Sequence, residues 1–266
     1  MRGDAVISTA VRDSAASHTT MRIVGRGSWL DAGSPVTAAS QLSLQDDSGI
    51  VAYVPDDLTV TVRAGTTLRE LAGVLAKHNQ WIALDPAGGE DCTIGATVAT
   101  CSYGPAAALF GTPRDQVLGM TVVLGTGDII RPGGRVVKNV AGFDLTRLMI
   151  GAWGTLGVIT EVTLRVRSRA MRGDSMAHMR RELPASHGFR EPGIVNAGLS
   201  AALKQRFDPA GILKGMGDDA LIAGLKPLRF EHRRPSYAAA SGAVARSSQA
   251  RVSPSTSGPI VRSTRA

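Results

Sequence analysis

Between residues 21 and 28 the chain reads Met21-Arg22-Ile23-Val24-Gly25-Arg26-Gly27-Ser28. The first four residues have the pattern of a short strand, and residues 4–18 before them carry apolar residues at helical spacing, so a helix is expected to lead into this strand. The two glycines let the backbone approach a ligand, and consecutive N–H groups in such a turn can bind an anion. A phosphate-binding loop and a simple turn both fit this stretch when it is taken alone.

Several familiar nucleotide and hydrolase signatures do not fit the chain. A Rossmann-type fingerprint would need a glycine at position 30 and a helix after it, but the chain has Leu30 followed by the helix-breaking stretch 31–35. The motifs of P-loop hydrolases, serine hydrolases and zinc peptidases do not occur either. The meaning of the glycine stretch therefore depends on what accompanies it elsewhere in the sequence.

Outward from this stretch, the residue pattern predicts strands mixed with helices. A helix is expected from Thr67, where Glu70 completes a capping-box pattern, to Asn79. Residues 85–113 are rich in Gly and Pro and are expected to form loops that meet a ligand. The other expected elements are strands at 50–54, 58–63 and 158–166, a hairpin at 120–131, and helices at about 144–150 and 197–207.

The composition is that of a globular domain with an ordinary core, since 43% of the 266 residues are hydrophobic and 20% are charged. No run of about 18 apolar residues and no secretion-type leader occurs, so a cytoplasmic protein without a membrane span is expected. Cys92 and Cys101 lack further cysteine or clustered histidine partners. They are expected to be small buried residues rather than members of a disulfide or of a metal site.

The positive charge of the chain is concentrated at one end. The formal net charge is +8, and residues 221–266 hold eight Lys or Arg against one acidic residue. The remaining residues have a net charge close to zero, so their charge does not indicate that they bind nucleic acid. The Ser-, Ala-, Arg-, Pro- and Gly-rich tail is expected to be disordered, with a weak phosphate-binding arm as the alternative.

Three further segments follow the glycine stretch at wide intervals, namely 91–100, 114–119 and 154–161. With residues 25–28 they resemble the FAD-binding domain of flavoproteins of the vanillyl-alcohol oxidase and para-cresol methylhydroxylase (PCMH) type. More narrowly, residues 138–148 and 203–213 are similar to the FAD-binding subunits of bacterial glycolate oxidases. The resemblance covers residues 4–168 and 195–213. It implies an α+β fold of two subdomains with FAD between them.

The resemblance also implies which residues contact the cofactor. The pyrophosphate loop would be Gly25, Arg26, Gly27 and Ser28. The second loop, along the pyrophosphate, ribityl chain and flavin, would be Thr93, Ile94, Gly95, Ala96, Ala99 and Thr100. Backbone near the flavin or adenine would come from Gly157 and Ile159. Arg114 and Asp115 match an arginine–aspartate pair that contacts the cofactor or fixes a loop through a salt bridge. Trp29 stands where some relatives attach FAD to a histidine, so FAD is expected to be non-covalent.

In function, the resemblance implies the FAD-binding subunit of a glycolate oxidase or dehydrogenase-type complex that oxidises 2-hydroxy acids, for example glycolate to glyoxylate. The expected partners are a larger catalytic flavoprotein subunit and an iron–sulfur subunit, and the complex would be cytoplasmic or peripheral to the inner membrane. The larger subunit is the expected seat of the oxidation, so no catalytic residue is assigned. No metal ligand and no nucleic-acid partner are expected.

The chain departs from the resembled family after Ser168, where a substrate or cap domain is normally inserted. Only 28 unpatterned residues, 168–195, stand there, and the usual Asn-Pro-Gly after Ile212-Leu213 is replaced by residues 214–217. An FAD-binding or assembly module without turnover, or a stand-alone aldehyde, alcohol or sugar oxidase, therefore stays open. The expected parts are an FAD-binding domain at 1–168, a linker remnant at 169–195, a C-terminal family segment at 196–217 and the basic tail at 218–266.

Overall fold

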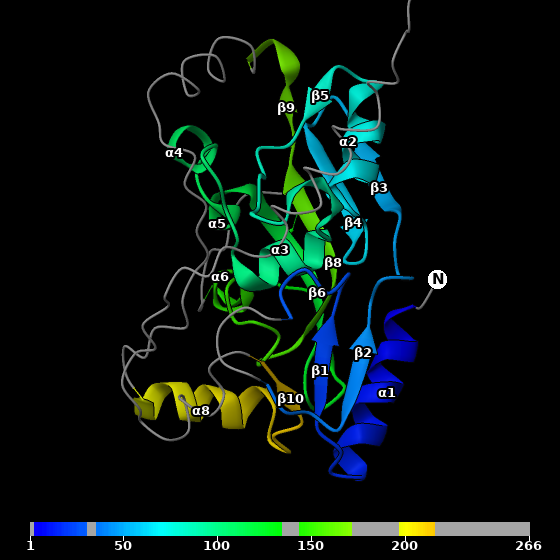
Figure 1. Ribbon diagram of the computed structural model, residues 1–266, viewed down its shortest axis with the longest axis vertical. Coiled ribbons are helices and arrows are strands. Elements are labelled where there is room, and N and C mark those ends of the chain that lie inside the picture. Colours follow the sequence, from blue (N-terminus) through cyan, green and yellow to red (C-terminus); the bar gives the residue numbers. More distant parts are fainter. Residues whose placement is uncertain (1–2, 31–35, 135–143, 172–196, 216–266) are drawn as a thin grey trace, which may run out of the picture. The chain divides into compact units, whose positions relative to one another are not determined.

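The computed structural model describes residues 3–30, 36–134, 144–171 and 197–215. Most of the expected linker remnant and the whole of the basic tail lie outside these residues. In the described part, helices accompany two main sheets (Figure 1). The mixed α+β fold expected from the sequence is therefore confirmed.

The first sheet has three parallel strands in the order β10–β1–β2. They are β10 (Leu213–Lys214), β1 (Met21–Val24) and β2 (Ser40–Ser43). Figure 1 shows α1 (Asp4–Ala16) beside β2. The helix packs its fully buried Ile7 and Val11 into one apolar cluster with Met21 and Leu213. The predicted helix and strand at the start of the chain are thus confirmed, and the central strand pairs with a segment from far along the sequence.

The second sheet has five strands, all antiparallel, in the order β3–β4–β8–β6–β7. Their bounds are β3 (Ile50–Val54), β4 (Thr59–Arg63), β8 (Val158–Arg165), β6 (Val117–Val123) and β7 (Ile129–Ile130). A small ladder, β5 (Gln80–Trp81) with β9 (Arg167–Ser168), continues beyond it. These strands confirm the predicted strands and the predicted hairpin, whose arms are β6 and β7.

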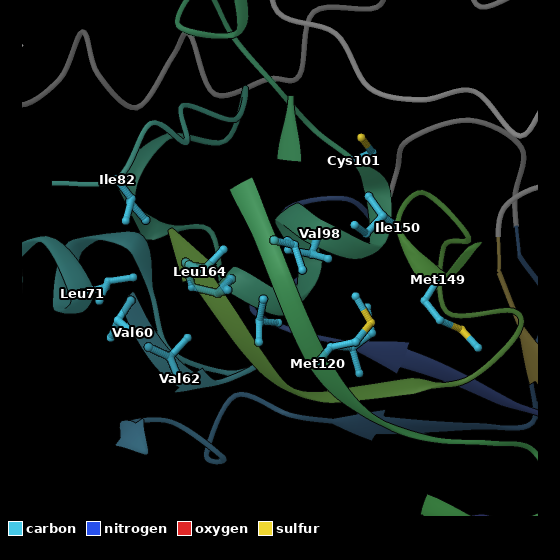
Figure 2. Close-up of a cluster of buried hydrophobic side chains, with 14 of the residues drawn as sticks. Val60, Val62, Leu71, Ile82, Val98, Cys101, Met120, Met149, Ile150 and Leu164 are labelled. Carbon is cyan, nitrogen blue, oxygen red and sulfur yellow. The ribbon is translucent and has the colours of Figure 1, made fainter. Parts of the chain in front are cut away.

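The core of the second sheet is an apolar cluster shared between strands and helices. Val60 and Val62 of β4 and Leu164 of β8 meet Leu71 of α2 (Leu68–Ala76) and Val98 of α3 (Ile94–Thr100) there, and Figure 2 shows these side chains converging. All five are at most 1% exposed. Since burial of each such side chain contributes about 1.5–3 kcal/mol, this cluster fixes α2 and α3 against the sheet.

The remaining helices are short, and none of the helices in the described part is long and apolar enough to cross a membrane. Helix α2 (Leu68–Ala76) begins with the predicted capping box, in which Thr67 and Glu70 each satisfy the other's backbone N–H. The others are α3 (Ile94–Thr100), α4 (Ala107–Phe110), α5 (Pro113–Gln116), α6 (Leu145–Met149), α8 (Ala197–Phe207) and the 3-10 turns η1 (Gly89–Asp91) and η2 (Arg169–Met171).

One local prediction was wrong, and one predicted strand starts at a different residue. Residues 85–113 are not loop throughout, because α3 lies inside them and is started by the Thr93 side chain, which accepts a hydrogen bond from Ala96 N–H. The strand expected from residue 58 begins one residue later, since Leu58 has a φ of +52°, a turn conformation. In both places the conformation of one residue, the helix cap Thr93 or the turn residue Leu58, decides where the element begins, and the surrounding composition does not reveal it.

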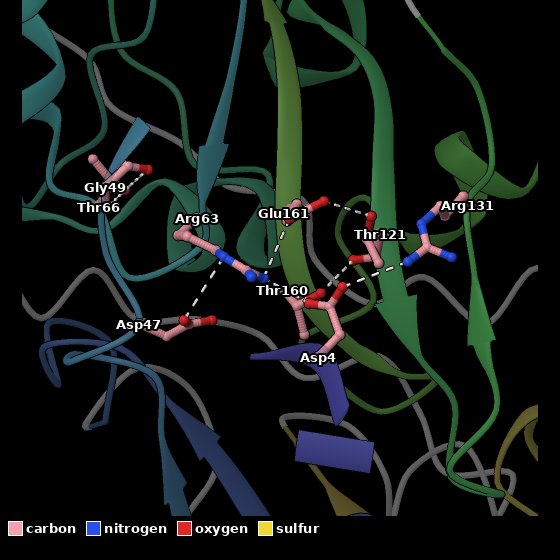
Figure 3. A network of polar contacts seen from close by, with 9 residues as sticks. All are labelled: Asp4, Asp47, Gly49, Arg63, Thr66, Thr121, Arg131, Thr160 and Glu161. Carbon is pink, nitrogen blue, oxygen red and sulfur yellow. Dashed lines mark hydrogen bonds and ion pairs between the residues drawn. The ribbon is translucent and has the colours of Figure 1, made fainter. Parts of the chain in front are cut away.

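An ion-pair network ties α1 to the second sheet (Figure 3). The Arg63 guanidinium at the end of β4 lies 2.6 Å from Asp4 of α1, 3.3 Å from Glu161 of β8 and 3.8 Å from Asp47 in the loop after β2. Asp47 is completely buried, and neither of its side-chain oxygens accepts a hydrogen bond from a residue that the structure describes. One cation thus holds three carboxylates from three different segments.

Candidate functional site

A cleft opens where the first sheet meets α3 and the start of β8. Its volume is about 760 Å³, including the part that is open to solvent. The described part of the chain brings eleven of the fifteen site residues expected from the sequence to its walls. They are Gly25, Gly27, Ser28, Trp29, Thr93, Gly95, Ala96, Ala99, Thr100, Gly157 and Ile159.

The first wall is the loop that follows β1. Gly27 has a φ of +82°, which a residue with a side chain rarely adopts, so the turn needs glycine. The backbone N–H groups of Arg26, Gly27 and Ser28 donate to no acceptor among the residues described. Three neighbouring unsatisfied donors at the edge of a cleft form a site for an anion.

The first loop packs directly on the segment that begins α3. A Cβ on Gly25 would collide with the hydroxyl of Thr93. Further along the loop, the Ser28 side chain hydrogen-bonds to the Cys92 thiol. Burial raises the pKa of Cys92, and this hydrogen bond opposes the rise only in part. The two segments therefore form one continuous surface.

The second wall is α3, and its first amides are already used by the protein. Ile94 N–H donates to Thr66 O at 2.8 Å and Gly95 N–H to Ala64 O at 2.8 Å. A Cβ on Gly95 would lie 2.6 Å from the Ala64 Cβ, so glycine is required for α3 to approach β4. This wall offers small side chains rather than anion-binding donors.

The third wall runs from Trp153 to the start of β8. Trp153 N–H donates to Ala99 O at 2.9 Å, which ties this segment to α3. Trp153 and Gly154 line the cleft beside Gly157 and Ile159, although only the latter two were predicted. The glycine-rich segment containing Gly154 was visible in the sequence, but nothing in it indicated that the neighbouring tryptophan faces the cleft.

The fourth wall comes from the end of the described chain, where Lys214 and Gly215 line the cleft. The pairing of β10 with β1 places Lys214 level with Arg22, which also lines the cleft. Burial lowers the pKa of Arg22. Sequence reasoning assigned neither cation to the site, because the parallel pairing of two segments so far apart has no local signal.

A buried lysine fixes this fourth wall. Lys204 of α8 is 7% exposed, and its Nζ donates to Thr155 O at 2.8 Å and to Leu213 O at 2.6 Å. It also forms an ion pair with Asp208 at 2.9 Å. The Asp208 carboxylate accepts the N–H of Leu213 at 2.9 Å, so α8, β10 and the third wall are joined.

Four expected site residues lie outside the walls of the cleft. Arg26 is exposed. Ile94 is fully buried in the apolar core, where the α3 periodicity directs it. The Arg114 guanidinium donates to Arg147 O at 3.1 Å, and the Asp115 carboxylate completes the capping box of α5. For Arg114 and Asp115 the structure therefore shows roles in fixing local structure, not a contact with the cleft.

Both cysteines are buried and form no disulfide, as expected. In the described ranges, no group of three or more His, Cys, Asp or Glu side chains is placed to hold a metal ion. The chemistry that the cleft offers is therefore that of backbone donors, small residues, two tryptophans and two cations. Such a lining suits a large, partly aromatic ligand with an anionic group.

Comparison with protein families and known proteins gives a consistent result. Residues 3–133 match the family described as FAD binding domain. The glycolate oxidase subunit GlcE of Escherichia coli (strain K12) is 37% identical over 68% of this chain and 51% of its own length. The mitochondrial D-lactate dehydrogenase [cytochrome] of Arabidopsis thaliana is 44% identical over 42% of this chain and 19% of its own length.

Two further similarities extend this result. The glycolate oxidase subunit GlcD of Bacillus subtilis (strain 168) is 39% identical over 42% of this chain and 24% of its own length. Among solved structures, alkyldihydroxyacetonephosphate synthase superposes with a TM-score of 0.54 and 21% identity, over 63% of this chain and 31% of that one. The chain thus matches about half of GlcE and a quarter or less of the other two curated relatives.

Proposed function

The chain carries an FAD-binding domain of the PCMH type and belongs to a family of FAD-dependent oxidoreductases, and we propose that it is the FAD-binding subunit of a complex that oxidises 2-hydroxy acids. The reaction we propose for the complex is the oxidation of glycolate to glyoxylate. The observation that carries the proposal is the cleft, in which the glycine loop after β1, α3 and the start of β8 meet.

The residues of the cleft fit FAD. The unsatisfied amides of Arg26, Gly27 and Ser28 would bind the diphosphate, and Gly95 and Ala96 would leave room for the rest of the dinucleotide. A bound flavin supplies a hydride acceptor for the C–H bond beside a substrate hydroxyl. The chain's own residues bind and orient the cofactor, and we assign none of them a proton-transfer role. With Trp29 in the first loop, we propose non-covalent FAD.

The partners we propose are a larger catalytic flavoprotein subunit and an iron–sulfur subunit. Support comes from the similarity to GlcE, a glycolate oxidase subunit, over 68% of the chain. We propose that the complex is cytoplasmic or peripheral to the inner membrane. We propose that the chain is divided into an FAD-binding domain (1–168), a linker remnant (169–195), a C-terminal family segment (196–217) and a basic tail (218–266). The C-terminal family segment contains β10, which pairs with β1 in the first sheet.

A second candidate function is an FAD-binding or assembly module without its own turnover. It is favoured by the short stretch 168–195, where the resembled flavoproteins insert a substrate domain. The two candidates make the same prediction for cofactor binding and opposite predictions for reduction by substrate.

The experiment is an absorption spectrum of the purified full chain before and after acid precipitation, followed by anaerobic addition of glycolate or D-lactate, alone and with the co-expressed partner subunits. Flavin in the supernatant that is bleached only in the presence of partners supports the subunit. Flavin that is never bleached in either preparation supports the module. If the chain neither contains flavin nor takes up added FAD, both functions are wrong.

A further inference from the structure

Two cations lie side by side in the cleft. Arg22 and Lys214 are register partners on the adjacent parallel strands β1 and β10, which lie about 4.8 Å apart, so their side chains leave the sheet on the same face. Both line the cleft, and no Asp or Glu lines it within the described residues. The charge on this wall is therefore entirely positive in the part of the chain that is described.

Neither cation is neutralised by a carboxylate in the described part of the chain. No ion pair joins Arg22 or Lys214 to a carboxylate of residues 3–30, 36–134, 144–171 or 197–215. Like charges at neighbouring positions of a sheet are unfavourable, and partial burial adds a desolvation cost. Burial lowers the pKa of Arg22, as expected for a cation without a counter-charge. An anion bound between the two side chains would remove both costs.

The position of the Arg22 side chain indicates where such an anion lies. One guanidinium nitrogen, Nη2, donates to the Leu30 carbonyl at 3.0 Å, which holds the group against the loop that follows β1. The unsatisfied amides of Gly27 and Ser28 belong to the same loop. Among the described residues the other guanidinium donors have no acceptor. They suit a ligand with several oxygens, which is the geometry that arginine favours.

We propose that Arg22 and Lys214 form a cation pair that binds the diphosphate of the dinucleotide together with the amides of the loop after β1. This inference rests on the proposed function in taking the ligand to be FAD. A diphosphate carries two negative charges, which match the two cations, and its oxygens can accept from both side chains and from the loop.

The test measures nucleotide affinity, not turnover. Flavin-free full chain is titrated with FAD, ADP and adenosine while the fluorescence of the two cleft tryptophans, Trp29 and Trp153, is followed. Lys214→Gln is expected to weaken ADP binding by about tenfold or more and to leave adenosine binding within about twofold. Lys214→Arg, which keeps the charge, is expected to restore ADP binding.

The matched control is Lys77→Gln, because Lys77 is an exposed lysine at the end of α2, outside the cleft. It is expected to leave the affinities for FAD, ADP and adenosine unchanged. The thermal midpoints of all variants are measured alongside, so that unfolding of β10 is distinguished from loss of a charge. A smaller dependence of ADP affinity on salt concentration in Lys214→Gln is a second expected signature, since salt screens charge pairs.

The outcomes separate this inference from the proposed function. If the wild-type chain binds FAD and Lys214→Gln binds ADP equally well, the cation pair is wrong and the proposed function stands. If ADP binds in a Lys214-dependent manner but FAD does not bind, the cation pair stands and the proposed function is wrong. If adenosine affinity falls as much as ADP affinity, or if neither nucleotide binds the wild type, the diphosphate contact is overturned.

Discussion

Gly25 and Thr93 are in such close contact that a single methyl group on the glycine would occupy the space of the threonine hydroxyl. Gly25 belongs to the loop after β1, and Thr93 is the residue that caps α3. The contact therefore joins two neighbouring segments that both line the cleft. Any change that separates them alters the cleft and the start of α3 together.

Gly25→Ala is expected to lower FAD affinity by about ten- to a hundredfold, because the new methyl group forces the loop away from Thr93. The same overpacking is expected to cost about 1–3 kcal/mol of unfolding free energy. Flavin retention after gel filtration and chemical denaturation measure the two effects. Gly73→Ala is the control, since Gly73 lies within α2 with open space around it and is expected to stabilise the protein by about 0.5–1 kcal/mol. Equal flavin retention in both variants would contradict the prediction.

Lys204→Met is expected to destabilise the protein by about 3–5 kcal/mol, because it leaves the buried Asp208 carboxylate without its cation. The measurement is the midpoint of urea unfolding. The variant is also expected to lose FAD affinity, since Lys204 holds both Thr155 and Leu213. The exposed Lys77→Met serves as control and is expected to change the midpoint little. If Lys204→Met lowers the free energy of unfolding by less than about 1 kcal/mol, Lys204 does not hold the fourth wall of the cleft in place.

Asp47→Asn is expected to stabilise the protein at pH 7 by an amount on the order of 1 kcal/mol. Burial raises the pKa of Asp47, and the nearby carboxylates Asp4 and Glu161 act in the same direction, while Arg63 opposes them. The pKa of Asp47 is higher in the folded state than in the unfolded state. Its contribution to the free energy of unfolding is therefore fully present at acid pH and is lost as the pH rises through the folded-state pKa. Arg63 keeps Asp4 and Glu161 as partners in the variant.

The check is the thermal midpoint of wild type and Asp47→Asn between pH 3 and pH 8. The difference is expected to be largest at neutral pH and to vanish at acid pH, where the wild-type carboxyl is protonated as well. Asp57→Asn, an exposed position, controls for net charge. If Asp47→Asn is instead less stable than wild type at pH 7, and this difference disappears at pH 4, the prediction is wrong. That result would show that the attraction of Arg63 for the Asp47 carboxylate outweighs the cost of its burial.

The two cysteines are expected to be unreactive in the native protein. Cys92 is 0% and Cys101 3% exposed, and burial raises the pKa of Cys92, so the reactive thiolate is scarce. Titration with a coloured disulfide reagent at pH 8 is expected to detect no fast thiol in the native state and two after unfolding in guanidinium. A native thiol that reacts within seconds would contradict the packing of Ser28 on Cys92.

Local signals predicted much of the fold. The helix at the start of the chain, the Thr67 capping box and the alternation from Val158 onward depend on residues close together in sequence, and each is found in the structure. Strand β2 was not predicted, because its four residues, Ser40–Ser43, are mostly polar and have no alternation. Its place in the sheet comes from pairing with β1, a contact between segments about twenty residues apart.

The site was predictable where glycines and small residues mark it, and not where distant pairing creates it. Gly25 and Gly95 lie at the cleft because the backbone must approach another segment there, and Gly27 lies there because the turn needs a positive φ. Arg22 and Lys214 could not be assigned, since their juxtaposition exists only once β10 pairs with β1. Ile94 was assigned by its place in a motif, but the helical periodicity of α3 sends it into the core.

The pairing of Met21 with Leu213 sets the order in which the cleft can be completed during synthesis. A nascent chain that has emerged only to residue 200 already contains the glycine loop, α3 and the start of β8, yet the central strand of the first sheet still has one open edge. That edge offers unpaired backbone groups until residues 213 and 214 arrive. The wall of the cleft that Lys214 and Gly215 line can therefore form only after the last residues of β10 have been synthesised and have paired with β1.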